Sequence, residues 1–316
     1  MKIKNGILIG AIITLVTLLS TPVYSLGAPS WNSNTATIEA PGIVVRFFDR
    51  QPHYLIWVPG ENGTTVYFIK FLEIDEFVDQ NGNGLYEENE RVAFSYLTGM
   101  GEWNIYAETL EGPDNSTELR ITMQATIMIQ PTTFGNSTAN VTFVNHIFDK
   151  DVDLNEYEIA GGKEVKIDII IENWPWKYKN SMLALGIIFG TCDHQGREYR
   201  AQIHQREHAN HQEGVELEHG ELGYKLEFRY QDEVRVRNGD QEELIEINGT
   251  LEEKQNKDIL YLVYPHFEDK LVHDPSIKAT EGTEFELPAD YMIPIGVAGV
   301  AIVAAVAIYA VFRRKG

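Results

Sequence analysis

Twelve residues, 79–90, place oxygen-bearing side chains at a regular spacing around a glycine. The segment reads Asp-Gln-Asn-Gly-Asn-Gly-Leu-Tyr-Glu-Glu-Asn-Glu and matches the calcium-loop template D-x-[DN]-x-[DN]-G-x5-E at every specified position. Calcium takes about six to eight oxygen ligands, and Gly84 permits the sharp turn between them. The expected ligands are the side chains of Asp79, Asn81, Asn83, Glu87 and Glu90 and the backbone carbonyl of Leu85. The segment therefore predicts a bound hard cation, with calcium as the cofactor.

The residues around this loop indicate that it connects two strands. An EF-hand loop lies between two helices, but 66–74 has the composition of a strand and 75–78 is too short for a full helix. Residues 87–94 suit one helical turn or another strand. Asparagine at two ligand positions leaves few charges, so we expect an affinity of about 10⁻⁴–10⁻³ M. We interpret the loop as a filled structural site; the alternative is an Asn-Gly turn without metal.

A second acidic run, 149–155, is a weaker candidate for calcium. Asp149, Asp151 and Asp153 supply oxygens at every other position, but no glycine provides the turn. The alternative interpretation is a solvated connection.

Histidines near the single cysteine form a candidate transition-metal site. His204 and His208 are four residues apart and His208 and His211 three apart, so a helix would place them on one face. The neighbouring residues are polar, and no H-E-x-x-H motif occurs, because Gln205 follows His204. We therefore prefer a solvated histidine-rich loop to a zinc or copper site. The metal site would comprise Cys192, His194, His204, His208 and His211.

Signatures of common enzyme classes are missing from the sequence. It has no G-x-S-x-G, no P-loop and no dinucleotide-binding glycine pattern after a strand. The 47 acidic residues include enough carboxylates for a glycosidase-like pair, but sequence does not give their separation. Four aromatic residues suit glycan stacking, although such residues more often pack in a core or at a rim. They are Trp103, Trp174, Trp176 and Tyr178, and 173–176 is the best candidate for a shaped rim.

The two ends of the chain predict a single-pass type I membrane protein. Residues 1–25 have the basic start, apolar core and small residues of a signal peptide; an uncleaved anchor is the alternative. Residues 291–312 form an apolar run that, at about 1.5 Å per residue, crosses a bilayer core of about 30 Å. The basic tail 313–316 follows it, so the positive-inside rule places the tail in the cytoplasm and the bulk outside.

Composition fits an extracellular location. The chain has 26 Lys and Arg against 47 Asp and Glu, a formal net charge of −21, which repels nucleic acid and anionic lipid. We therefore expect no nucleic-acid partner. A single cysteine leaves packing and metal to stabilise the fold. N-x-[ST] sequons predict glycosylation at Asn62, Asn115, Asn136, Asn140 and Asn248.

Hydrophobic periodicity predicts an all-β ectodomain, an antiparallel β-sandwich, at 26–278. Apolar and polar residues alternate along 119–130, 165–171 and 224–230, and 43–48, 66–74, 183–189 and 259–264 are also strand-like. A break near 149–162 either divides two smaller sandwiches or is a long connection within one large sandwich, which we prefer. An acidic stalk, 279–290, would lead to the membrane span.

Three segments resemble uncharacterised archaeal surface proteins. They are 71–84, 165–176 and the pair Tyr264-Pro-His-Phe267 and Leu271-Val-His273-Asp-Pro275. The resemblance implies a signal peptide, a β-rich ectodomain and one C-terminal span, and it brings no activity. The span also resembles tails that archaeal sorting enzymes remove. Because the Pro-Gly-Phe signature is missing, we expect a permanent anchor.

These features lead to three hypotheses about function. The first is a non-enzymatic, calcium-stabilised, glycosylated surface protein that binds an extracellular protein or glycan or forms part of the envelope. The second is a membrane-anchored hydrolase of polysaccharide or peptide. The third is a surface protein that binds a transition metal through Cys192 and the histidines.

Overall fold

The structure, a computed structural model, describes the greater part of the expected ectodomain. The described residues are 26, 29–32, 35–58, 66–98, 102–131, 137–154, 158–192, 198–199, 202–208, 212–218, 224–254 and 257–281. The expected signal peptide (1–25), membrane span (291–312) and tail (313–316) lie outside them. In the part that the structure describes, no helix combines the length and hydrophobicity needed to cross a bilayer.

Ten of the described strands form one antiparallel sheet. Its main path runs β1-β2-β3-β4-β5-β13-β21-β20, while β6 pairs with β5 and β14 with β13. The strands are β1 (Ser30–Asn32), β2 (Thr35–Glu39), β3 (Val44–Phe48), β4 (Gln51–Trp57), β5 (Val66–Phe77), β6 (Arg91–Tyr96), β13 (Met182–Cys192), β14 (Glu198–Tyr199), β20 (Asn248–Lys254) and β21 (Lys257–Tyr264).

Eleven of the described strands form a second antiparallel sheet, which forks at β12. On one side β12 pairs with β9, while on the other side its first residues pair with β23 and its last with β22. Beyond these neighbours lie β8 and β7, then β18 and β19 on one branch and β17, β16 and β15 on the other. The strands are β7 (Asn104–Glu111), β8 (Thr117–Met128), β9 (Thr138–Phe148), β12 (Glu164–Glu172), β15 (Gln202–His208), β16 (Gln212–Glu218), β17 (Tyr224–Gln231), β18 (Glu233–Asn238), β19 (Gln241–Glu246), β22 (Lys270–His273) and β23 (Ser276–Glu281).

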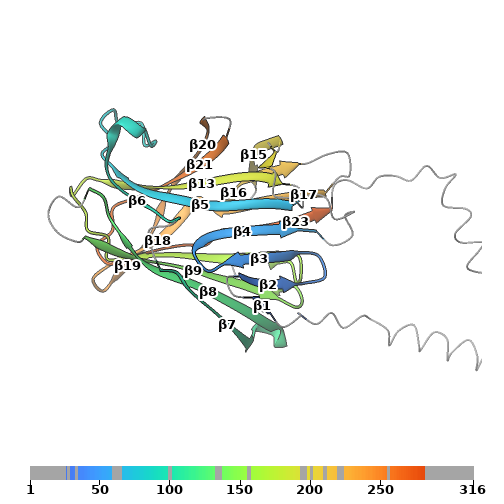
Figure 1. The fold of residues 1–316 in the computed structure, drawn as a ribbon. Helices are drawn as coiled ribbons and strands as arrows, with labels where there is room; N and C mark the ends of the chain where they lie inside the picture. Colours follow the sequence, from blue (N-terminus) through green and yellow to red (C-terminus); the bar gives the residue numbers. More distant parts are fainter. Residues whose placement is uncertain are drawn as a thin grey trace, which may run out of the picture.

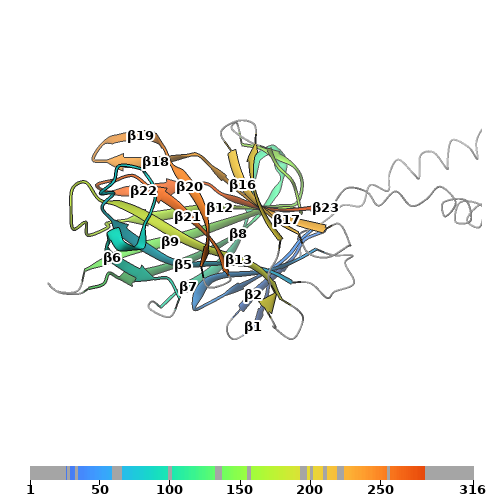
Figure 2. The same ribbon diagram turned by 90° about the horizontal axis from the view of Figure 1, so that it is seen from above.

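The two sheets share one hydrophobic core. A single cluster of buried apolar side chains draws on both sheets. Between ring centroids, Phe71 of β5 lies 4.7 Å from Phe143 of β9, and Phe189 of β13 lies 5.3 Å from Phe228 of β17. Figure 1 shows β5 and β13 in one layer and β8 and β9 in the other, and Figure 2 shows the same stack from above. The described chain is thus nearly all β with antiparallel sheets, which is consistent with a β-sandwich.

Period-two alternation produces the core face of these strands, as expected from the sequence. Along β8, Leu119, Ile121 and Met123 are buried, while Gln124 and Thr126 are exposed on the other face. Residue 43 lies before β3 and residues 129–130 lie after β8, but the seven runs predicted as strands otherwise coincide with observed strands. They are β3, β5, β8, β12, β13, β17 and β21.

Segment 149–162 is a connection that packs on the end of β9. It contains the paired short strands β10 (Val152–Asp153) and β11 (Glu158–Ile159), whose Val152 and Ile159 cover Phe148. Strands from before and after the segment enter the same two sheets. The preference for one large sandwich over two smaller ones stays a prediction.

The end of β23 corrects the expected stalk. Residues 279–281 belong to this strand and pair with β17, where Ala279 lies opposite Leu226 and is buried. The strand therefore replaces the first three residues of the predicted stalk, and 282–290 lie outside the described residues.

Candidate calcium site

The loop 78–90 connects two strands that pair with each other. β5 and β6 are antiparallel neighbours, with Asp75 opposite Phe94 and Phe77 opposite Arg91. The backbone N–H of Val78 donates to the carbonyl of Glu90 at 3.2 Å and closes the loop. One 3₁₀ turn, η1 (Glu88–Glu90), leads directly into β6. The prediction that the loop connects two strands is confirmed. The segment 87–94 contains both forms expected for it, because 88–90 make one helical turn and 91–94 belong to β6.

Side-chain oxygens in the first half of the loop are aimed inward by backbone N–H groups. The Asp79 carboxylate accepts from Gly82 N at 2.7 Å and Gly84 N at 2.8 Å. Both glycines have positive φ, +74° and +71°, which permits the tight turn. The Gly84 N–H is the main cause of a lowered pKa at Asp79, which burial opposes and further loop N–H groups reinforce. Asp79 is therefore held as an anion.

The amide side chains of the loop meet Glu87. The Asn81 Oδ1 accepts from Asn83 N at 2.9 Å, and the Asn83 Oδ1 accepts from Leu85 N at 2.8 Å. Their Nδ2 groups donate to the same Glu87 oxygen, at 2.8 and 3.1 Å. Each amide oxygen keeps a second lone pair for another partner. The structure thus brings these three expected ligands together in one hydrogen-bonded unit.

Glu90 closes the loop with a buried carboxylate. Glu90 is only 2% exposed, and its Oε1 accepts a hydrogen bond from the backbone N–H of Gln80 at 2.8 Å. Its Oε2 is buried and has no hydrogen-bond partner among the described residues. A buried carboxylate oxygen without a donor is costly, and a cation in the loop would remove that cost.

The loop's set of oxygen donors is mixed in type. Nowhere among the residues that the structure describes do three or more His, Cys, Asp or Glu side chains come together in a group that could hold a metal ion. In this loop only Asp79, Glu87 and Glu90 of the expected ligands are carboxylates, and the remaining oxygens are amide or backbone oxygens. Such a low-charge donor set suits calcium rather than a transition metal.

Tyr86 fixes the loop to the outer face of the first sheet, which sequence reasoning missed. Its ring packs against Phe77 and Tyr261, at centroid distances of 5.4 and 4.7 Å. Its hydroxyl donates to Asp75 of β5, a residue with no exposed surface. An aromatic residue inside an otherwise polar loop was the available signal, but its partner depends on the pairing of β5 with β6.

Burial gives Asp75 an unusual protonation equilibrium. It raises the pKa of this carboxyl to about 7, and the neighbouring Glu73 adds to the rise. The Tyr86 hydroxyl and Arg91, whose Nη1 lies 3.7 Å from the carboxylate, act in the opposite direction. The base of the loop 78–90 therefore contains a carboxyl whose pKa is raised far above its ordinary value.

The second acidic run uses its carboxylates separately. The Asp149 Oδ1 accepts from Thr117 N at 2.8 Å, and the Asp151 Oδ1 accepts from Gly161 N at 2.8 Å. Asp153 lies on β10 with an exposed side chain. Two of the three candidate ligands thus hold different backbone segments, and the structure does not show them sharing a site.

The transition-metal candidates lie on two different sheets where they are described. Cys192 is on β13 of the first sheet, buried in a cluster with Phe68 and Ile188. His204 is exposed on β15 of the second sheet. Residues 202–208 form a strand, so the loop expected there is wrong for that part, and no helical face forms. The structure does not describe His194, His211 or the side chain of His208.

The aromatic rim candidates are mainly packing residues. The Trp174 indole is buried and donates to Glu76 at 3.2 Å, and the Trp176 indole donates to the carbonyl of Phe267 at 2.6 Å. Trp103 is also buried, whereas Tyr178 is exposed. Glycan stacking is therefore not the role that these contacts favour for the tryptophans.

Three of the five sequon asparagines lie among the described residues, and all three are exposed. Asn115 ends the short helix η2 (Pro113–Asn115), Asn140 lies within β9, and Asn248 begins β20. The Asn248 amide also donates to the carbonyl of Gly84 at 3.4 Å, so it touches the calcium loop. Asn62 and Asn136 lie outside the description.

Comparison with known proteins adds no family assignment. No family model matches the chain, and no curated protein matches its sequence. The resemblance to archaeal surface proteins therefore stays an expectation from sequence.

Proposed function

We propose that this chain is a non-enzymatic cell-surface protein whose β-sandwich is stabilised by calcium bound at 79–90. The observation that carries the calcium part is the buried Glu90 carboxylate, which has one oxygen on Gln80 N and the other without a described partner. Calcium in the loop would satisfy that oxygen and draw on the oxygens of Asp79 and the asparagines. The ion would then stabilise the connection between β5 and β6.

The proposed site is a structural staple and not a switch. Calcium sensors work by changing the angle between two helices that flank the loop. Here the flanking elements are two paired strands, and Tyr86 holds the loop against Phe77 and Tyr261. Calcium binding would therefore change the stability of this region and leave its partners in place.

The proposed location is the outer surface of a cell membrane. It is supported by the signal-like start, the apolar run 291–312 with its basic tail, and the net charge of −21. The exposed asparagines of three sequons are compatible with glycans on the folded protein. The sandwich would present a face to an extracellular protein or glycan, or serve envelope structure.

Thermal melting of the purified full chain tests the calcium part. At calcium about 100 times the Kd, a site present only in the folded state adds about 2.7 kcal/mol. For a chain of this size that raises the Tm by roughly 5–10 °C relative to chelator. An identical melt in both conditions would remove calcium from the proposal. Elemental analysis of the same sample would instead favour the transition-metal hypothesis if it found stoichiometric zinc or copper.

One observation favours hydrolysis as a second candidate. Glu73 and Asp75 lie on one face of β5, and burial raises the pKa of both carboxyls. Perturbed carboxyl pairs occur at catalytic sites. However, Asp75 has no exposed surface beneath Tyr86, so a substrate does not reach it in this structure. Turnover of polysaccharide or peptide that is lost in Asp75→Asn would establish this alternative.

A further inference from the structure

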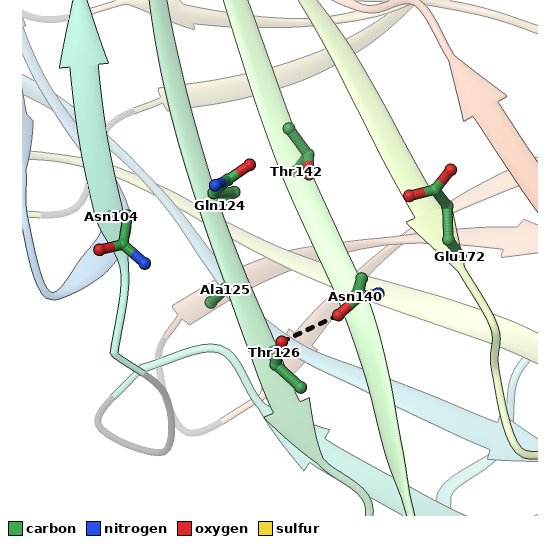
Figure 3. A pocket seen from close by; sticks show the side chains of 7 residues that line it. All are labelled: Asn104, Gln124, Ala125, Thr126, Asn140, Thr142 and Glu172. Carbon is green, nitrogen blue, oxygen red and sulfur yellow. Dashed lines mark hydrogen bonds between the residues drawn. The ribbon is translucent and has the colours of Figure 1, made fainter.

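A polar groove lies on the outer face of the second sheet, away from the calcium loop. Its volume is about 290 Å³, close to the lower end of the about 300–1,000 Å³ typical of ligand pockets. Figure 3 shows its side chains on neighbouring strands β7, β8, β9 and β12. The polar lining consists of Asn104, Gln124, Thr126, Asn140, Thr142 and Glu172.

Strand register fixes the positions of these side chains in two rows. One row runs across Asn104, Gln124 and Thr142, which are paired in register. The next row runs across Thr126, Asn140 and Glu172. Each row crosses three hydrogen-bonded strands. The groove is therefore carried by a rigid sheet, which suits a preformed site better than a loop does.

Most hydrogen-bonding groups of the lining are available to a ligand. Thr126 donates to the Asn140 Oδ1 at 2.9 Å, the one bond drawn between lining residues in Figure 3. Within the described part of the chain, the side chains of Asn104, Gln124 and Thr142 form no hydrogen bond to another residue. Amides and hydroxyls both donate and accept. The lining thus offers donors and acceptors side by side.

This combination fits the hydroxyl groups of a neutral sugar ring. Each sugar hydroxyl also donates and accepts, so alternating amide and hydroxyl partners can satisfy it. Glu172 faces Lys270, at 3.7 Å between Oε1 and Nζ, so the lining's one carboxylate is partly neutralised. Tyr106, which is 47% exposed, follows Asn104 by two residues on the same strand face. Its ring supplies an apolar surface beside the polar groove.

The sequon at Asn140 lies inside the groove. Asn140 is its acceptor and Thr142 its hydroxyl residue, and both line the groove. A glycan attached to Asn140 would begin inside the groove, one strand from Gln124 and two strands from Asn104. The same lining would serve an external polysaccharide if Asn140 carried no glycan.

We propose that this groove is a saccharide subsite for a neutral, hydroxyl-rich ring, supplied either by the glycan on Asn140 or by an external polysaccharide. The inference deepens the proposed surface function. Where the sugar is the glycan on Asn140, the inference rests on the proposed glycosylation. It does not depend on calcium, because the loop and the groove belong to different sheets.

The external source is tested with the full chain made in a host that does not attach N-glycans. Saturation-transfer NMR would be recorded with glucose, mannose, galactose, N-acetylglucosamine and their short oligomers. We expect one of these classes to bind, and Gln124→Ala or Asn104→Ala to weaken binding by a few-fold to about tenfold. Gln241→Ala, an exposed glutamine on β19, is the matched control and should bind as the wild type does. Glu90→Gln should also keep binding, which separates this test from the calcium proposal.

The internal source is tested with the chain made in a glycosylating host. Mass spectrometry would locate the glycans, and a peptide-N-glycosidase would be applied to the folded protein. We expect slower release from Asn140 than from exposed Asn115, with the difference lost in Gln124→Ala and kept in Gln241→Ala. Binding in the first experiment identifies an external ligand, and protection in the second identifies the chain's own glycan. No binding together with no protection would overturn the proposal.

Discussion

The two acidic connections of this chain, 79–90 and 149–162, both carry side-chain oxygens at alternate positions but use them differently. In 79–90 the carboxylates of Asp79 and Glu90 accept from backbone N–H groups of the same loop, and the asparagine side chains meet at Glu87. In 149–162 the carboxylates of Asp149 and Asp151 hold Thr117 and Gly161. The first connection organises its oxygens around itself, whereas the second uses them to hold other segments.

The glycines of the two connections show the same contrast. A Cβ added at Gly82 would meet no heavy atom within 4 Å, while one at Gly161 would lie 2.1 Å from the carbonyl carbon of Lys150. The first loop is therefore open at Gly82, and the second is closed at Gly161 by its own backbone. The two connections share alternating oxygens, but among their described residues a turn with two glycines of positive φ and one buried acceptor without a donor occur only in the first.

Gly161→Ala should have the largest effect. Its Cβ would overlap the backbone of Lys150, and such overpacking costs about 3 kcal/mol, or roughly 6–12 °C in Tm. The loss should be the same with calcium and with chelator. Gly82→Ala is the matched control, with open space but a φ of +74°, and should cost about 1–2 kcal/mol. Equal losses in both variants would remove the contrast between open and closed loops.

Glu90→Gln should have the next largest effect on stability. The variant should be less stable than the wild type in calcium but not in chelator. Without the carboxylate, the calcium increment of about 2.7 kcal/mol at 100 times the Kd should disappear. In chelator the variant should be at least as stable as the wild type, because a buried charge has been removed. Melting curves in both conditions measure this. A variant that keeps the full calcium increment would show that Glu90 is not a ligand.

Asp75→Asn should change how the stability of the protein depends on pH and leave the stabilisation by calcium unchanged. The folded pKa of Asp75, about 7, lies above its ordinary value of 3.8, so the folded state binds the proton more tightly. The wild type should therefore lose stability progressively as pH rises from about 4 to 7.

The Asn variant should lack that loss, be more stable than the wild type at pH 8, and keep its calcium increment. The groups that act on Asp75 are Glu73 on its own strand, Tyr86 and Glu88 of the loop, and Arg91 on β6. Denaturant unfolding at pH 4, 6 and 8 measures the effect. An unchanged slope with pH would mean that Asp75 does not titrate in this range.

Asp151→Asn should have the smallest effect. The asparagine oxygen can still accept from Gly161 N, so a change within about 0.5 kcal/mol is expected. Melting with and without calcium should give equal shifts. A loss of stability that appears only in calcium would make 149–155 a second calcium site and end the comparison.

Local patterns account for much of what the sequence predicted correctly. The alternation of apolar and polar side chains predicted β8 and β12, because such a pattern with period two can be read from residues adjacent in the chain. The loop at 79–90 is likewise confined to twelve consecutive residues, and its position between two strands is confirmed, whereas the calcium itself stays a prediction. The strand at 202–208 was missed because it has one apolar residue, Ile203, and its histidines suggested a polar loop.

Long-range pairing accounts for what the sequence did not reveal. The contact of Tyr86 with Asp75 requires β5 and β6 to be neighbours, and the groove requires the register of four strands. Gln124 and Thr126 lie on the polar face of the predicted strand 119–130, whereas Asn140 was singled out only as a glycosylation sequon and its strand β9 was not predicted. Nothing local to either strand indicated that Thr126 would lie opposite Asn140.

The fork of the second sheet at β12 has a consequence for the timing of folding. β12 lies between β9, which precedes it, and β22 and β23, which end the described chain. At synthesis rates of about 5–20 residues per second, roughly 110 residues separate the end of β12 from the end of β23, a delay of about 5–20 s. During that interval one edge of β12 is unpaired, and unpaired strand edges invite association with other chains. This sheet is therefore completed only late in synthesis, and protection of β12 until then would favour correct assembly.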